Sequence, residues 1–329
     1  IGGLNTESKV DIIEPLVSFI VSRFTSNYSI YFAVWAGIFG FFYLKSVNLL
    51  YFHNQENHGW NTTILMVFFI MIIPVTSISG IRMWTAAWIF FFGAYHVIVH
   101  RDPRYFLIAI LSCLLHWSYL SVNILLLIYY LAGNRNLIYL PLALASFVVP
   151  QLITPFLRAI SLRMGGAYQK RFEGYSSEEY LLVQQESAQQ SAWFLKIGSN
   201  ILFYYLLLMI IFIQFQGKSV IKEKDEKNLY SFLLLLLAFV NFGMPIPSLG
   251  TRFQVIFFLF ATLYIYFYFS KLPGNRISFP IVLGLFPMLL YTAINFRMGS
   301  ESISAWILSP GFGIPLLSPV LSLSEMLFN

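Results

Sequence analysis

The chain has 329 residues, of which 58% are hydrophobic and 19% aromatic, whereas only 10% carry a charge. Because soluble domains carry about 25% charged residues, this composition excludes an ordinary soluble protein and indicates a membrane protein. The formal net charge of +6 is spread along the chain without a compact basic patch, which argues against nucleic acid as a partner. The apolar runs are continuous rather than alternating, a pattern that predicts spanning helices and not a β-barrel.

The apolar runs predict an all-α integral membrane protein, a polytopic helical bundle of about nine to ten membrane segments in one domain, 1–329. About 20 apolar residues cross the hydrocarbon core as a helix. The candidate spans are 28–50, 62–79, 82–99, 105–132, 137–160, 191–215, 229–248, 252–270 and 277–297. A polar stretch occupies 161–190 and the most charged loop is 216–228, while the sequence assigns no place to 298–329.

The N-terminal segment 1–27 contains an amphipathic stretch, KVDIIEPLVSFIVSRFTSN. Its apolar residues fall on one face, which is typical of a helix that lies in the membrane interface. Pro15 is tolerated in a first helical turn and so places Glu14 at the helix N-terminus. Glu14 then has two interpretations: it complements the helix dipole, or it is a general base beside a cationic site, with Asp11 as the second choice.

Two arginines follow glycines at predicted helix starts. Arg82 comes after Gly80 and opens the span 82–99, although a cation at a helix N-terminus is opposed by the helix dipole. A guanidinium beside free backbone amides makes a good anion site instead. The same layout recurs where Gly250 precedes Arg252. The alternative is that both arginines extend to lipid headgroups.

The span 105–132 is too long for a single straight crossing. A helix of this length measures about 42 Å, whereas the hydrocarbon core is roughly 30 Å thick. Its middle reads SCLLHWSYLS, which is polar enough to bend. We therefore expect two short helices that enter and leave on the same side, with His116 at the turn; tilt is the alternative. His116 is either a functional intramembrane group or a hydrogen-bonded core residue.

Other basic residues are weaker candidates for anion binding. Arg158 and Arg163 lie near helix C-termini, where a cation is favoured in any case. In YQKRFEGY, Arg171 and neighbouring tyrosines such as Tyr168 could contact a sugar, but surface loops often have this composition. The sequence carries no zinc signature or phosphate-binding loop, so we expect no metal ion and no cofactor.

The stretch 79–120, SGIRMWTAAWIFFFGAYHVIVHRDPRYFLIAILSCLLHWSYL, resembles the central part of the EpsG family, relatives of the Wzy-type polysaccharide polymerases. That family has a Ser-x-x-Arg motif, a basic cytoplasmic turn and an apolar helix that ends in His followed by Ser. Here Ser79 and Arg82, HRDPR, and His116 with Ser118 are similar to these features. The Glu-Pro pair at Glu14 resembles the family's extracytoplasmic segment, and GTRF resembles a later arginine.

The resemblance implies a bacterial inner-membrane glycosyltransferase of GT-C-like architecture. It would polymerise surface polysaccharide (O-antigen, capsule or exopolysaccharide) at the periplasmic face. Its donor and acceptor would be undecaprenyl-pyrophosphate-linked oligosaccharide repeat units held in the lipid bilayer, and a chain-length regulator is a further candidate partner. Arginines would stabilise the leaving pyrophosphate without a metal ion, while Glu14 would accept the acceptor's proton and His116 would orient a phosphate or hydroxyl.

Two other classes of function remain open on the residues alone. A flippase for lipid-linked oligosaccharides would also place arginines near the interface, but it would not need Glu14. A membrane acyltransferase that modifies polysaccharide would use a histidine, for which His116 is the candidate. In that enzyme the loss of His116 would abolish activity, whereas the loss of Arg82 would only weaken binding.

Overall fold

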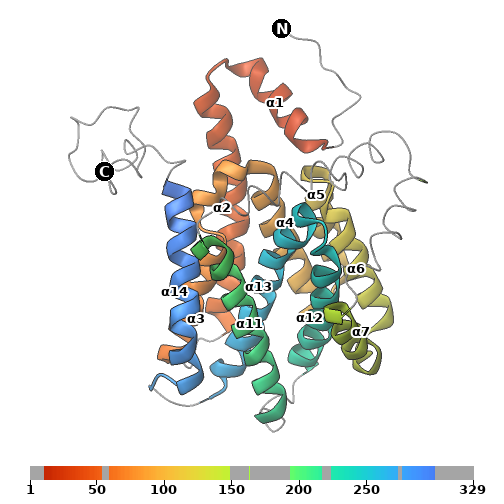
Figure 1. The fold of residues 1–329 in the computed structure, drawn as a ribbon. Coiled ribbons are helices and arrows are strands. Elements are labelled where there is room, and N and C mark those ends of the chain that lie inside the picture. The colour runs from red at the N-terminus through yellow and green to blue at the C-terminus, as the bar shows by residue number, and fades with distance from the viewer. Residues whose placement is uncertain are drawn as a thin grey trace, which may run out of the picture.

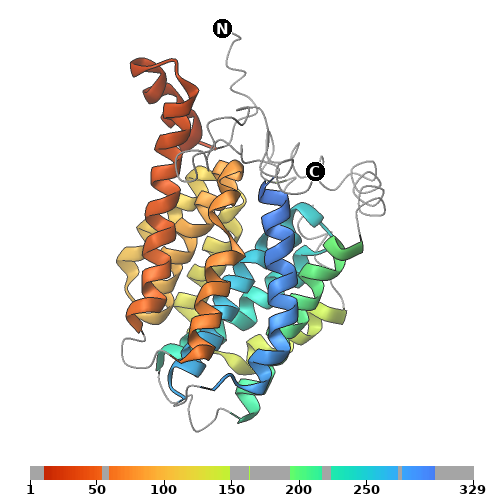
Figure 2. The same ribbon diagram turned by 90° about the vertical axis from the view of Figure 1, so that its left-hand side faces the viewer.

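The computed structural model describes residues 11–53, 59–148, 163, 193–216, 224–272 and 276–300. Within these ranges every regular element is a helix, and the long helices lie side by side as a bundle (Figure 1, Figure 2). The elements in chain order are α1 (Ile13–Phe24), α2 (Tyr28–His53), α3 (Trp60–Ile72), η2 (Val75–Gly80), α4 (Ile81–Val99), η3 (Pro103–Tyr105), α5 (Phe106–Leu115), α6 (Tyr119–Ala132), α7 (Asn136–Val148), α11 (Trp193–Gln216), α12 (Lys224–Gly243), α13 (Pro247–Ser270) and α14 (Phe279–Ser300).

The lengths and composition of these helices confirm a polytopic helical membrane protein. Among the described residues, five helical stretches are long and apolar enough to cross a membrane, and shorter apolar helices accompany them. The five stretches are Tyr28–His53, Trp60–Ser77, Ile197–Gln216, Leu249–Ser270 and Phe279–Gly299. The outer helices α2 and α14 expose most of their apolar side chains, as helices that face lipid do.

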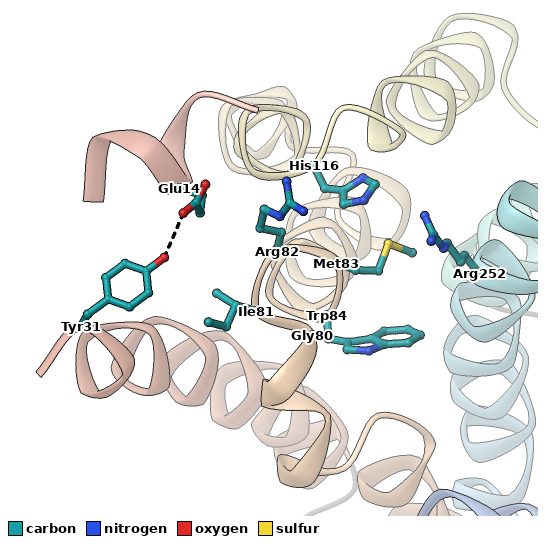
Figure 3. Close-up of a pocket in the computed structure, with 9 residues that line it drawn as sticks. All are labelled: Glu14, Tyr31, Gly80, Ile81, Arg82, Met83, Trp84, His116 and Arg252. Atoms are coloured by element: carbon teal, nitrogen blue, oxygen red, sulfur yellow. Dashed lines mark hydrogen bonds between the residues drawn. The ribbon is translucent and has the colours of Figure 1, made fainter. Parts of the chain in front are cut away.

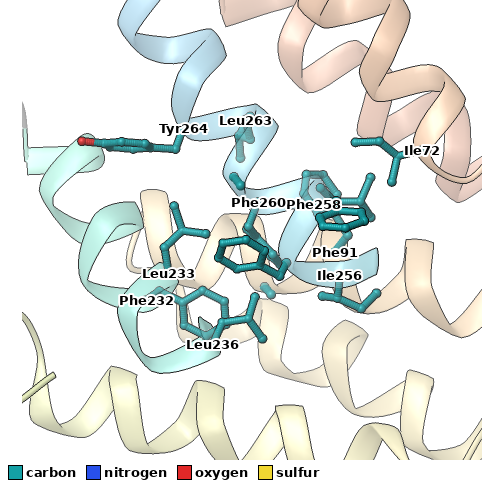
Figure 4. Close-up of a cluster of buried hydrophobic side chains, with 14 of the residues drawn as sticks. Ile72, Phe91, Phe232, Leu233, Leu236, Ile256, Phe258, Phe260, Leu263 and Tyr264 are labelled. Atoms are coloured by element: carbon teal, nitrogen blue, oxygen red, sulfur yellow. The ribbon is translucent and has the colours of Figure 1, made fainter. Parts of the chain in front are cut away.

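Helix α13 forms the centre of the bundle. Within its apolar stretch, 94% of the residues are buried, because the helix is hydrophobic on all sides and packs against neighbours all round. Phe260 contacts Phe91 of α4 at 4.8 Å and Phe232 of α12 at 5.2 Å between ring centroids (Figure 4). This aromatic core fixes α4 and α12 relative to α13, and it thereby sets the positions of the side chains at the ends of those helices.

The segment 105–132 forms a helical hairpin, as predicted. Helix α5 ends at Leu115 and α6 begins at Tyr119, with His116 in an extended conformation between them. Inside the hairpin, Asn123 of α6 donates to Ser112 Oγ of α5 at 3.0 Å. The prediction of two short helices with His116 at the turn is therefore confirmed.

The hairpin as a whole begins and ends at the same end of the bundle. The guanidinium of Arg101, just after α4, donates to Tyr129 Oη at 3.2 Å and to the Tyr130 carbonyl at 3.3 Å near the end of α6. At the other end of α4, Tyr119 donates to the Met83 carbonyl at 3.0 Å. We call the end that carries α1, η2 and the hairpin turn 116–118 the α1 end. The end near Arg101 is the opposite end.

The helix boundaries correct three details of the sequence prediction. Helix α12 begins at Lys224, so residues 224–228 of the predicted loop 216–228 are helical, with Asp225 and Glu226 in the first turn, where acidic side chains favour a helix. The span 62–79 ends as an α-helix at Ile72, and Pro74 precedes a separate 3₁₀ turn, η2. Helix α13 begins at Pro247, whose fixed φ suits a helix start. Arg252 therefore lies in the second turn and does not open the helix.

Candidate active site

A cavity of about 700 Å³ opens at the α1 end of the bundle (Figure 3). It is formed where α1, α2, η2, α4, the hairpin turn and α13 come together. These elements are far apart in the sequence, and the cavity brings together four of the side chains that the sequence singled out, Glu14, Arg82, His116 and Arg252. Its lining residues are Glu14, Tyr31, Gly80, Ile81, Arg82, Met83, Trp84, His116 and Arg252.

Arg82 lies in the first turn of α4, two residues after Gly80, as predicted. Its Nη1 donates to Asp11 Oδ2 at 2.7 Å, and its side chain is 50% exposed, whereas that of Asp11 is 5% exposed. A glycine is needed before Arg82 because a Cβ at Gly80 would collide with the indole ring of Trp84. The η2 turn runs directly into α4, so the first turn of α4 that carries Arg82 is not an isolated helix end.

Arg252 brings a second guanidinium into the cavity from α13. Figure 3 shows it on the side of His116 and Met83, across the cavity from Glu14. Within the described part of the chain it makes no hydrogen bond and no ion pair. The backbone before it is tightly packed, since a Cβ at Gly250 would meet the backbone of Met244. Close packing at Gly250 therefore fixes the backbone that precedes Arg252.

His116 lies at the hairpin turn, between the two arginines. Its Nδ1 is 2.7 Å from Ser118 Oγ and accepts a longer bond, at 3.4 Å, from the Ser118 backbone N–H. A backbone N–H can only donate, so in the neutral imidazole the proton is on Nε2. Ser118 therefore orients the ring and makes Nε2 a hydrogen-bond donor.

Glu14 provides the acidic side of the cavity. It lies in the first turn of α1, with Pro15 next to it, as predicted. Its Oε1 accepts hydrogen bonds from Tyr31 Oη at 3.1 Å and from Ser18 Oγ at 3.2 Å. Figure 3 shows Tyr31 of α2 beside Glu14, with its hydroxyl pointing at the carboxylate. The sequence analysis missed Tyr31, because a tyrosine at the start of an apolar span carries no distinguishing signal among 20 tyrosines.

Among the described residues, two predicted site residues, Asp11 and Arg163, do not line this cavity. Asp11 lies behind Arg82, and Ser79 is in η2, next to the lining residue Gly80. Arg163 is exposed. Arg158, Tyr168 and Arg171 lie outside the described residues, as do the segment 301–329 and all of 161–190 except Arg163. In the described ranges no three His, Cys, Asp or Glu side chains gather closely enough to hold a metal ion.

The arrangement separates two kinds of chemistry within one cavity. Arg82, Arg252 and the Nε2–H of His116 offer donors and positive charge, which suit a phosphate or pyrophosphate group. Glu14 offers a hydrogen-bonded carboxylate, which can accept a proton from a hydroxyl group. Met83 and Trp84 add apolar surface to the lining. Such a site can bind an anionic leaving group and a neutral hydroxyl compound together.

The family assignment rests on the match along the sequence. The sequence model of the EpsG family matches residues 5–307, which include every described residue. No curated protein and no solved structure matches the chain. Because the family match covers most of the chain, the chain belongs to the EpsG family, membrane proteins of the Wzy-like polysaccharide polymerase type.

Proposed function

We propose that this chain is a glycosyltransferase that joins undecaprenyl-pyrophosphate-linked oligosaccharide repeat units into a surface polysaccharide. The observation that supports the proposal best is the single cavity that holds two arginines, a histidine and a carboxylate. A polymerase needs both sides of this cavity, since it must bind a pyrophosphate leaving group and activate a sugar hydroxyl in the same site. The family's association with glycosyltransferase-like polymerase activity agrees with this reading.

In the proposed reaction, a hydroxyl oxygen of the acceptor repeat unit attacks the anomeric carbon of the donor. The new glycosidic C–O bond forms as the bond between that carbon and the pyrophosphate oxygen breaks. Glu14 accepts the hydroxyl proton, and the bonding electrons leave with the pyrophosphate. Arg82 and Arg252 stabilise the negative charge that develops there, and they act strongly because the site is partly shielded from water.

His116 donates from Nε2 to a phosphate oxygen or to a sugar hydroxyl, between the two guanidiniums. The arginines supply the electrostatic stabilisation that a divalent cation gives in other phosphate chemistry, so the proposed reaction is independent of metal ions. We place the cavity at the periplasmic face of the inner membrane, where lipid-linked repeat units and a chain-length regulator would meet it.

The test is a reaction of the purified protein with undecaprenyl-pyrophosphate-linked repeat units, extracted from a strain that lacks this chain and resolved as a gel ladder. The wild type should produce a ladder of polymer. We expect Arg82→Ala to lower the rate about 10²–10³-fold, as the loss of a donor to a developing anion does. Glu14→Gln should lower it at least about 10²-fold through the loss of the base.

A matched control is Arg104→Ala, which removes a guanidinium that pairs with Asp102 at 3.1 Å and lies at the opposite end of the bundle. This variant should make the wild-type ladder. If the wild type binds the lipid-linked sugar but makes no polymer, the protein is a flippase or uses another acceptor. An acyltransferase would instead lose all activity with His116→Ala and only affinity with Arg82→Ala.

A further inference from the structure

Asp11 connects two parts of the candidate site through its two carboxylate oxygens. Its Oδ2 accepts from Arg82 Nη1 at 2.7 Å, and its Oδ1 accepts from the backbone N–H of Trp117 at 3.0 Å. One carboxylate therefore connects the first turn of α4 to the hairpin turn, next to His116. A further backbone bond, from Ile12 N–H to the Leu114 carbonyl at 2.9 Å, fixes the segment that carries Asp11 to the end of α5.

The location of Asp11 separates it from Glu14. Asp11 is 5% exposed and does not line the cavity, whereas Arg82 lines it and is half exposed. A carboxylate with both oxygens engaged and no surface in the cavity cannot reach the hydroxyl of an acceptor. It also does not occupy the space that a phosphate would take, so it does not compete with a ligand for the exposed edge of the guanidinium.

We infer that Asp11 is a positioning residue for the pyrophosphate site, which it holds together by fixing Arg82 relative to the hairpin turn. This inference rests on the proposed function, because it assigns a role within that site. It replaces the sequence-based expectation of Asp11 as a second-choice base with a role that acts through Arg82.

The physical reason is the flexibility of arginine. A half-exposed arginine samples many rotamers, and ordering it on ligand binding costs side-chain entropy. Asp11 orders the side chain before the ligand arrives and uses one terminal nitrogen. The guanidinium has five N–H donors in a rigid plane, so other donors can still face the cavity. The bond to Trp117 anchors Asp11 in turn, so that Arg82 and His116 keep a constant separation.

The experiment is a double-mutant cycle on ligand binding. The probe is undecaprenyl pyrophosphate, and the dissociation constant is measured with the full-length protein in nanodiscs. Asp11→Asn keeps an oxygen for the Trp117 N–H but places an NH₂ group against Arg82. That NH₂ group cannot accept the hydrogen bond that Arg82 donates. We expect this variant to bind about tenfold more weakly, and Arg82→Ala to bind more weakly still. The double variant should be no weaker than Arg82→Ala alone, because Asp11 acts only through Arg82.

The control is Asp102→Asn, the same substitution in an Asp–Arg pair at the opposite end, which should bind like the wild type. Tighter binding by Asp11→Asn would overturn the inference, because Asp11 would then be a competing counter-ion. Additive losses in the double variant would also overturn it. If Asp11→Asn does not accumulate in membranes, Asp11→Glu replaces it, and the same non-additivity is required. A wild type that does not bind undecaprenyl pyrophosphate would contradict the proposed function instead.

Discussion

The hydrogen bond between Tyr31 and Glu14 joins α2 to α1 at one side of the cavity. Tyr31 Oη donates to Glu14 Oε1 at 3.1 Å, and Ser18 donates to the same oxygen from within α1. The Tyr31 ring packs edge-on against Trp35, which is fully buried, at 6.4 Å between centroids. The phenol is therefore held by the bundle and can fix the direction in which the Glu14 carboxylate points. In the proposed reaction this orients the base toward the acceptor.

Removal of this one donor gives a prediction at the residue scale. Tyr31→Phe keeps the ring and its packing but removes the hydroxyl, so Glu14 loses its only described tie to α2. A hydrogen bond to a charged group contributes about 1.5–3 kcal/mol, which corresponds to roughly a 10- to 100-fold lower rate if the whole of it is expressed in the transition state. The rate of ladder formation measures this. Tyr28→Phe, at an exposed tyrosine on the same helix, should leave the rate unchanged, and an equal loss in both variants would contradict the role of Tyr31.

Which site residues the sequence could predict depends on how unusual each is in its surroundings. Arg82 and His116 are rare residue types within apolar runs, so each signals a function by itself. Glu14 is marked by its neighbour Pro15, which fixes the helix start. Tyr31 carries no such signal. The two partners of Asp11 could not be predicted either, because Arg82 and Trp117 meet it only through the tertiary packing of α4 and the hairpin turn.

At the scale of helices, the position of His116 depends on how closely the hairpin packs on α4. A Cβ at Gly93 would lie 2.6 Å from the backbone nitrogen of Ala109, so the two helices touch backbone to backbone. Small residues allow this approach in membrane helices, where dispersion contacts replace the hydrophobic effect as the main attraction. The contact between Gly93 and Ala109 therefore sets the level at which the hairpin turn meets Arg82.

A methyl group at this contact should push the hairpin away from α4. We expect Gly93→Ala to lower stability by about 1–3 kcal/mol through overpacking, even though alanine is the better helix former. The thermal midpoint of the detergent-purified protein, followed by size-exclusion chromatography after heating, should fall. Gly40→Ala is the matched control, because nothing lies within 4 Å of a Cβ there and its midpoint should stay the same or rise. An unchanged midpoint for Gly93→Ala would show that α4 and α5 can separate freely.

The sequence predicted the existence of most helices but not all of their limits. Apolar length is a strong signal in membrane proteins, and the excess length of 105–132 correctly indicated a hairpin. The predicted start of α13, at residue 252, was wrong because Gly250 was interpreted as a helix boundary. In the structure Gly250 lies inside the helix, where its missing side chain lets the preceding turn at Met244 pack closely. A glycine needed for packing and a glycine that ends a helix look the same in one sequence.

At the scale of the whole molecule, the cavity lies at one end of the bundle, and this end must face one side of the membrane. The total of basic residues gives no answer, because the topology predicted from the sequence divides the 20 lysines and arginines evenly, ten on the side of Arg82 and ten on the other. The same predicted topology puts more of the arginines on the side of Arg82, a bias that suits phosphate recognition. The periplasmic location of the site thus rests on the proposed function and requires a direct measurement.

Cysteine labelling provides that measurement, because Cys113 is the single cysteine and is buried, so the wild type should remain unlabelled. Ser26→Cys places a thiol at an exposed position between α1 and α2, at the α1 end. Arg276→Cys places one at an exposed position before α14, beside Asn61, at the opposite end. In intact cells a membrane-impermeant maleimide should label Ser26→Cys, and it should label Arg276→Cys only after permeabilisation. The reverse pattern would put the cavity in the cytoplasm, where periplasmic polymerisation could not take place.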